Sequence, residues 1–211
     1  MSKHETLVSR LFPAFVETEE LFTFPAVDQL FNAERDQVCS ANDVRRAEFA
    51  AGRVCARRAM SRLGVTPAPL LAGADRAPIW PSGICGSITH TRDYAAAALC
   101  RQTDARAIGL DVEPWLPLDP ELIELVCLPE EIEQGRDEFT VGFLARLMFS
   151  AKECAFKCQF PLTKRYLEFT DVRVAVDPRA GTFQASIEGY TQMTGRFLIS
   201  QGLVATGLTL T

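Results

Sequence analysis

Residues 107–114 read Ala-Ile-Gly-Leu-Asp-Val-Glu-Pro, a pattern that predicts a short strand with two carboxylates at its end. Side chains on a strand alternate between its faces, so Asp111 and Glu113 point the same way, while Ile108, Leu110 and Val112 pack on the other side. Mg²⁺ takes paired carboxylates from a protein when a substrate phosphate supplies further ligands. A lone pair of this kind is more often a solvated strand edge, so its interpretation depends on the rest of the chain.

Composition places the chain among ordinary globular proteins. It has 211 residues, of which 47% are hydrophobic and 23% charged, as in typical soluble domains. No apolar run approaches the roughly 18 residues of a membrane span, and residues 1–5 are not followed by the apolar core of a signal peptide. A net charge of −5 argues against general nucleic-acid binding. We therefore expect a cytoplasmic protein with no membrane or nucleic-acid partner.

The cysteines support the same compartment. There are seven, an odd number, and no two of them form a C-x-x-C pair. Cys154 and Cys158 are four residues apart on a predicted helix, but no histidine accompanies them there. Reduced thiols of a cytosolic protein are the best interpretation, and we expect no zinc site.

The order of elements is that of an α+β protein. The predicted helices span residues 40–63, 119–127, 129–134 and 138–160. The predicted strands span residues 84–88, 94–100, 107–114, 169–176, 182–187, 196–200 and 203–210. Residues 94–100 could also form a helix, but the turn residues before them and their short length favour a strand. The first 40 residues carry too many apolar side chains for a disordered tail but show no assignable element. Two halves, residues 1–105 and 106–211, each contain one long helix and several strands.

The first long helix carries a row of arginines. Ser40 or Asn42 can cap it. At about 100° per residue, Arg46, Arg53 and Arg57 fall close together and away from the apolar face. Three guanidinium groups in a row would bind phosphate well. A merely solvated basic face is the alternative.

A small-residue segment precedes one of the two histidines. Residues 86–89 read Gly-Ser-Ile-Thr and lead into His90. Glycine and hydroxyl side chains let a backbone approach an anion closely, and the histidine can then hydrogen-bond a phosphate. A capping or core histidine is the alternative.

The second long helix carries a carboxylate and an amine on one face. Glu153 and Lys157 are four residues apart and therefore neighbours on the helix surface. An ordinary helical ion pair is the alternative. Lys152 lies about 100° round the helix from Glu153 and reads as a surface charge.

Together these stretches resemble the 4′-phosphopantetheinyl transferases. Gly-Ser-Ile-Thr-His at 86–90, Gly-Leu-Asp-Val-Glu at 109–113 and Phe-Ser-Ala-Lys-Glu-Cys-Ala-Phe-Lys at 149–157 follow that family's order and approximate spacing. Gly52-Arg53 and Trp80-Pro81 are similar to the branch that serves siderophore and peptide synthetases. The resemblance covers about residues 42–160. The chain departs from the family pattern at Thr89, usually serine, and at Phe149, often tryptophan.

The resemblance implies an architecture. Such enzymes of the monomeric type have two similar α+β lobes, each a small antiparallel sheet with a long helix, arranged as a pseudo-dimer with the site in the cleft between them. Residues 1–105 would form the lobe that binds coenzyme A phosphates, and residues 106–211 the lobe with the metal-binding carboxylates. We expect a monomer.

The resemblance also implies roles. These enzymes move the phosphopantetheine arm of coenzyme A onto a serine of an acyl- or peptidyl-carrier protein and release adenosine 3′,5′-bisphosphate. The metal ligands for Mg²⁺ would be Asp111, Glu113 and Glu153. The phosphate-binding residues would be Arg46, Arg53, Arg57, Thr89, His90 and Lys157. Glu153 or a metal-bound water would take the serine proton, and Lys157 would stabilise charge on the transferring phosphate.

Without the family, the residues indicate only Mg²⁺-dependent chemistry on a phosphorylated ligand. A Mg²⁺-dependent phosphohydrolase using the same three carboxylates is one alternative, although no second metal cluster is evident. A non-catalytic protein that binds coenzyme A or a carrier is another, although the four charged site residues are intact. A purely structural α+β domain is the third. Release of 3′,5′-ADP only with Mg²⁺ and a carrier protein would distinguish a transferase from all three.

Overall fold

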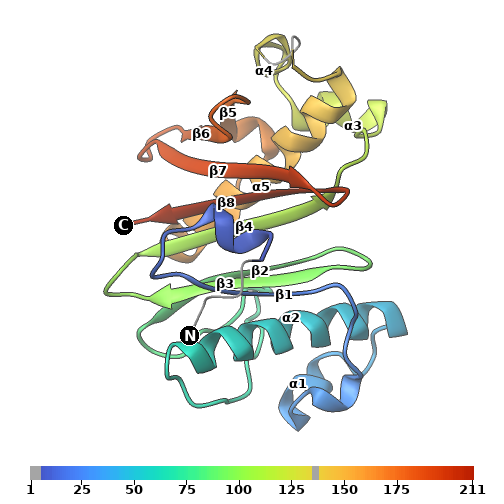
Figure 1. The fold of residues 1–211 in the computed structure, drawn as a ribbon, viewed down its shortest axis with the longest axis vertical. Coiled ribbons are helices and arrows are strands. Elements are labelled where there is room, and N and C mark those ends of the chain that lie inside the picture. The colour runs from blue at the N-terminus through green and yellow to red at the C-terminus, as the bar shows by residue number, and fades with distance from the viewer. Residues whose placement is uncertain (1–5, 135–137) are drawn as a thin grey trace.

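The chain folds into two antiparallel sheets, and one long helix lies against each of them (Figure 1). The computed structural model describes residues 6–134 and 138–211. The first sheet has the strand order β1-β3-β2 and the second β4-β8-β7-β6-β5. Helix α2 packs on the first sheet and α5 on the second. The expected α+β architecture of two lobes is confirmed, although the second sheet is the larger.

The element bounds agree with most of the predicted ranges. The strands are β1 (Glu17–Leu21), β2 (Ile84–His90), β3 (Ala95–Arg101), β4 (Ala107–Pro114), β5 (Val172–Asp177), β6 (Thr182–Ile187), β7 (Met193–Ser200) and β8 (Leu203–Leu210). The α-helices are α1 (Asn32–Gln37), α2 (Asp43–Arg62), α3 (Pro120–Val126), α4 (Pro129–Glu133) and α5 (Val141–Thr163); the 3₁₀ turns are η1 (Val8–Leu11), η2 (Val27–Gln29) and η3 (Phe169–Asp171). The main differences are that β1 and α1 form within the first 40 residues, where no element was assigned, that β7 starts before the predicted residue 196 and that η3 replaces the predicted start of β5.

Helix α2 is bounded and placed by identifiable residues. The Asn42 side chain caps it by accepting a hydrogen bond from the Arg45 amide at 2.8 Å, as N-cap residues do. Gly64 follows its end with φ +74°, a conformation that glycine adopts without strain. In the middle, a Cβ at Gly52 would lie 2.8 Å from Cγ2 of Ile88. Gly52 therefore lets the helix lie close against β2.

Helix α5 lies directly on β4 because of a second glycine. A Cβ at Gly109 would overlap the backbone carbonyl of Cys154 on the helix. The close approach places the turn containing Glu153 and Lys157 over the end of β4, where Asp111 follows two residues after the glycine. The packing of helix on strand thus determines how far apart the predicted site residues lie.

The two lobes meet along β2 and β4, which lie side by side without forming a backbone ladder (Figure 1). A buried apolar cluster fills the space between the sheets and includes Cys85 and Cys100 from the first and Ile108 and Leu110 from the second. The N-terminal turn η1 also packs on β7 and β8 and adds to this cluster. The predicted lobe boundary at residue 105 falls in the turn between β3 and β4 and stays a prediction.

Within the described ranges, no helix has the length and apolar character needed to cross a membrane. All seven cysteines are free.

Candidate active site

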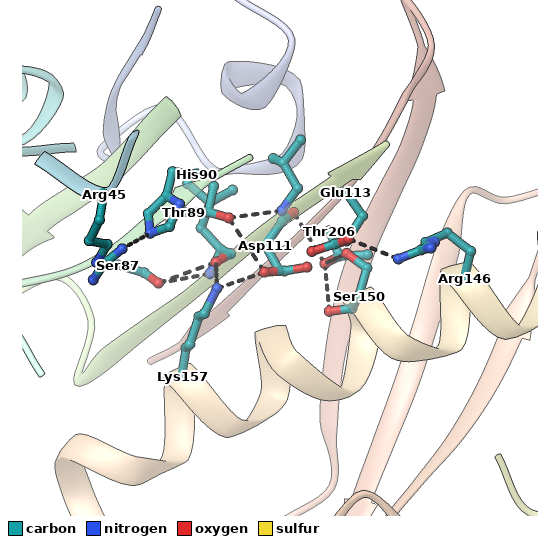
Figure 2. Close-up of polar contacts among 12 residues, drawn as sticks. Arg45, Ser87, Thr89, His90, Asp111, Glu113, Arg146, Ser150, Lys157 and Thr206 are labelled. Carbon is teal, nitrogen blue, oxygen red and sulfur yellow. Dashed lines mark hydrogen bonds and ion pairs between the residues drawn. The ribbon is translucent and has the colours of Figure 1, made fainter. Parts of the chain in front are cut away.

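The site centres on Asp111, which strand β4 carries into the seam between the lobes (Figure 2). Its side chain is buried, with only 3% of the residue exposed. Oδ1 accepts a hydrogen bond from Nζ of Lys157 at 2.6 Å. Oδ2 is buried and has no hydrogen-bond partner among the described residues. Buried carboxylate oxygens are normally satisfied, so this atom is positioned to meet a ligand.

Lys157 and Glu153 reach the site from one face of α5, as their four-residue spacing predicts. Nζ of Lys157 lies 3.4 Å from the carbonyl oxygen of Leu110 as well as contacting Asp111. Burial by itself would lower the pKa of Lys157, but its negative neighbours, above all Asp111 and then Glu153, together outweigh burial and the pKa is raised. Burial raises the pKa of Glu153; Lys157 opposes the shift and Asp111 adds to it. Lys157 is therefore a permanent cation beside two carboxylates.

Glu113 also belongs to the site. Its Oε2 accepts a hydrogen bond from Nη1 of Arg146 on α5 at 2.9 Å. Burial first, and the charge of Asp111 second, raise the pKa of Glu113 to about 7, whereas Arg146 and Lys157 act in the opposite direction. Two half-buried carboxylates, Glu113 and Glu153, whose pKa values are raised by burial and by neighbouring negative charge, are typical of a cation site.

The hydroxyl groups of the 86–90 segment join the two lobes. Oγ of Ser87 accepts a hydrogen bond from the Leu110 amide at 3.1 Å, and Oγ1 of Thr89 accepts one from the Val112 amide at 3.1 Å. Thr89 also lies 3.4 Å from Oδ1 of Asp111. Its direct contact with phosphate stays a prediction: the residue is 3% exposed, and its hydroxyl holds β4 and Asp111 in place.

His90 stands at the end of β2 and contacts an arginine that the sequence analysis passed over. Nη1 of Arg45 lies 2.8 Å from Nε2 of His90, and a guanidinium can only donate. The ring proton is therefore on Nδ1, which faces Glu48 Oε2 at 3.6 Å. Burial lowers the pKa of His90. A signal for Arg45 existed, since it lies two helical turns before Gly52 and so shares the face toward β2.

The three predicted arginines do not form a ridge. Arg53 is buried, donates through Nε to the Leu70 carbonyl at 2.7 Å and stacks over Phe49; burial lowers its pKa to about 10. Arg57 is held by the buried carboxylate of Glu34 at 2.8 Å, and Arg46 pairs with Asp43 at the surface. The predicted exposed row was wrong because periodicity could not show that residues 26–38 and 70 cover this side of α2.

The prediction that Lys152 is a surface charge is also wrong. The residue is 1% exposed, and Nζ donates to Glu131 Oε2 at 2.7 Å and to the Val126 carbonyl at 2.8 Å. Glu131 in turn accepts hydrogen bonds from the Leu128 and Val174 amides. This buried ion pair anchors α5 to α4 and β5.

Two pockets open beside this part of α5. The first has a volume of about 280 Å³ and combines cations with aromatic rings. Its relevant lining residues are Arg76, Trp80, Phe156, Lys157, Phe160, Lys164 and Tyr166. The second, about 220 Å³, is lined by Lys152, Glu153 and Glu168 together with four apolar side chains. Its relevant lining residues are Phe156, Leu167, Phe169 and Val172. Phe156 contributes to both.

The site carboxylates are oxygen donors of the kind that bind a hard cation, although their side chains do not converge on one point. Among residues 6–134 and 138–211, no three acidic, histidine or cysteine side chains converge as a metal cluster. Oxygen donors of the kind that Mg²⁺ takes alongside a phosphate are nevertheless present. They are the unpartnered Oδ2 of Asp111 and the carboxylates of Glu113 and Glu153, whose pKa values are raised.

Comparison with known proteins agrees with this geometry. Residues 33–100 match the model of the 4′-phosphopantetheinyl transferase N-terminal domain, and residues 107–200 match the 4′-phosphopantetheinyl transferase superfamily. The chain is 39% identical to the 4′-phosphopantetheinyl transferase Svp of Streptomyces mobaraensis over 96% of its own length and 88% of that protein. It is 33% identical to the 4′-phosphopantetheinyl transferase Npt of Nocardia iowensis over 96% of this chain and 99% of the relative.

A more distant relative is component D of the enterobactin synthase of Escherichia coli K12, which is 34% identical over 69% of this chain and 66% of that protein. The two family matches fall on the two lobes, one containing His90 and the other containing the carboxylates and Lys157. The chain belongs to the 4′-phosphopantetheinyl transferases, the enzymes that transfer the phosphopantetheine arm of coenzyme A to carrier proteins.

Proposed function

We propose that Asp111, Glu113 and Glu153 hold Mg²⁺ while the arm is transferred to a carrier serine. The unpartnered, buried Oδ2 of Asp111 is the observation that carries this proposal. When bound, the metal would neutralise charge on the phosphate under attack. Every other part of the mechanism rests on residues of this chain.

Coenzyme A spans the two pockets in this proposal. Aromatic rings and cations in the first pocket suit a base and its phosphates, and the apolar wall of the second suits the pantetheine arm. The phosphate that joins these two parts of coenzyme A would then lie between the pockets, beside Lys157 and Glu153. This placement explains why a lysine and a carboxylate occupy the turn of α5 that separates them.

Cations around the first lobe bind the remaining phosphates. Arg45 and His90 form one contacting pair at the end of β2. Arg53 supports this wall from a buried position. Arg46 is free to exchange its surface partner Asp43 for a phosphate, and Arg57 contributes positive potential from its place beside Glu34.

The chemical step is a displacement at phosphorus. The carrier serine oxygen forms the new bond to the phosphorus next to pantetheine, and the bond from that phosphorus to the leaving 3′,5′-ADP breaks. Glu153 accepts the serine proton as general base. Lys157, held by Asp111 at 2.6 Å, donates to the charge that develops on the transferring phosphate.

The relatives and the cysteines support a proposal for the setting of the reaction. We propose that the carriers belong to siderophore or peptide synthetases, since component D of an enterobactin synthase is among the relatives. A cytoplasmic location agrees with seven free cysteines. One chain supplies both lobes of the site, so we propose that the enzyme acts as a monomer.

Mass spectrometry of an apo carrier domain incubated with the protein, coenzyme A and Mg²⁺ tests the proposal. We expect a gain of about 340 Da on the carrier, the mass of one covalently attached phosphopantetheine arm. The gain should disappear when Mg²⁺ is chelated and should be formed far more slowly by Glu153→Gln. Release of 3′,5′-ADP without carrier modification would indicate a hydrolase instead. Calorimetric binding of coenzyme A with neither product would indicate a non-catalytic binder.

A further inference from the structure

Arg146 is a charged side chain fixed against the site without a role in the mechanism above. It lies on α5 about two turns before Glu153 and reaches back to the end of β4 (Figure 2). Nη1 donates to Oε2 of Glu113 at 2.9 Å, and Nε donates to the carbonyl oxygen of Leu116 at 3.1 Å. Only 18% of its side chain is exposed.

These contacts make Arg146 a fixed support and not a mobile surface charge. The hydrogen bond to Leu116 uses Nε, so the planar guanidinium is oriented before it meets Glu113. The guanidinium carbon Cζ of Arg146 also lies 5.9 Å from the centre of the Phe149 ring. Because three contacts already hold the Arg146 side chain, it loses little further conformational entropy when it holds Glu113.

The geometry of the ion pair leaves one carboxylate oxygen of Glu113 for a ligand. Arg146 engages Oε2 alone. Without it, Glu113 would be repelled by Asp111, which lies on the same face of β4, and could turn toward solvent. Residues that orient a metal-binding carboxylate from behind commonly change metal affinity by about 10- to 100-fold.

We propose that Arg146 is a positioning residue that fixes Glu113 through Oε2 and presents its other oxygen to the cation, and so sets the affinity of the site for the metal. This inference rests on the proposed metal-binding role of Asp111, Glu113 and Glu153. It concerns the metal and not the binding of coenzyme A, because Arg146 lines neither of the two pockets beside α5.

The test is a titration of Mn²⁺ into the full-length protein with coenzyme A and no carrier, with free Mn²⁺ followed by electron paramagnetic resonance. A blank contains coenzyme A alone. We expect Arg146→Met to weaken Mn²⁺ binding by about 10-fold or more. Arg146→Lys should weaken Mn²⁺ binding less than Arg146→Met does but should not reach the wild-type affinity, since an ammonium cannot make both contacts in one plane. Arg179→Met, which removes an exposed arginine paired with Glu138, should change nothing.

A second readout separates positioning from folding. The Mg²⁺ concentration for half-maximal carrier modification should rise in Arg146→Met, while the rate at saturating Mg²⁺ and the KM for coenzyme A stay near those of the wild type. Unchanged or tighter Mn²⁺ binding by a variant with wild-type Tm would overturn the inference. If the wild type and Asp111→Asn bind Mn²⁺ equally, the proposed metal site itself is wrong, which is a different failure.

Discussion

Gly109 on β4 and Cys154 on α5 are in such close contact that a Cβ on the glycine would overlap the cysteine carbonyl. This contact sets the distance between helix and strand, and with it the position of Glu153 and Lys157 over Asp111. One missing methyl group therefore determines the geometry of the predicted carboxylate site.

Gly109→Ala should destabilise the protein by about 3 kcal/mol, because the backbone of α5 must move away from β4 to admit the methyl group. Urea denaturation measures the effect. Gly64→Ala is the matched control: its Cβ would come no closer than 4.0 Å to a neighbour, Nη2 of Arg101, but φ is +74°, and the conformational cost alone is about 1 kcal/mol. Equal losses in the two variants would show that α5 can shift freely.

Thr89→Val should show whether the hydroxyl of Thr89 supports Asp111 or binds phosphate. The valine keeps the shape of the threonine but leaves the buried Val112 amide without its partner, which costs about 1 to 3 kcal/mol. We expect the Mg²⁺ requirement to rise and the KM for coenzyme A to change little, with Thr89→Ser close to wild type. A large rise in the KM for coenzyme A with an unchanged Mg²⁺ requirement would instead support the predicted contact between Thr89 and phosphate.

Lys152→Met should destabilise the fold by about 3 to 5 kcal/mol, because the carboxylate of Glu131 would remain buried without its counter-charge. Thermal or chemical unfolding measures this loss. Arg173→Met is the control, since it breaks the exposed pair with Glu130, which is worth about 1 kcal/mol or less. A similar small loss in both variants would mean that Glu131 is protonated or solvated when Lys152 is removed.

Lys157→Met should lower kcat by about 10²- to 10³-fold, the usual effect of losing one donor to developing charge. The substitution should leave coenzyme A bound, since aromatic and cationic groups of the first pocket remain. Single-turnover transfer to a carrier, together with calorimetry of coenzyme A, measures both quantities. Loss of binding with a normal rate at saturation would place Lys157 in ground-state recognition only.

Adding Mg²⁺ to the coenzyme A complex should raise the Tm of the wild type further but not that of Asp111→Asn, because a ligand stabilises only a native state that binds it. Differential scanning fluorimetry with and without a chelator measures the shift. An equal shift in both proteins would remove Asp111 from the metal site. Coenzyme A without metal serves as the reference for the nucleotide's own contribution.

The sequence by itself determined the features that follow from covalent geometry and local periodicity. Strand alternation placed Asp111 and Glu113 on one face, and helical spacing placed Glu153 beside Lys157, because both periods are properties of the backbone. The long helices followed from local rules in the same way, and these rules offered Asn42 as one of two caps for α2. The order of the three motifs was enough to indicate the family and the two-lobed α+β architecture.

Only the tertiary structure decided which partners these residues meet. Arg53 and Lys152 looked exposed on their helices but are buried, since segments distant in the sequence cover those faces. Thr89 supports Asp111 across the lobe seam, and Arg146 holds Glu113 from 33 positions away. Such contacts depend on how close two elements pack, and that distance is set by long-range fits such as Gly109 against Cys154, which no local pattern specifies.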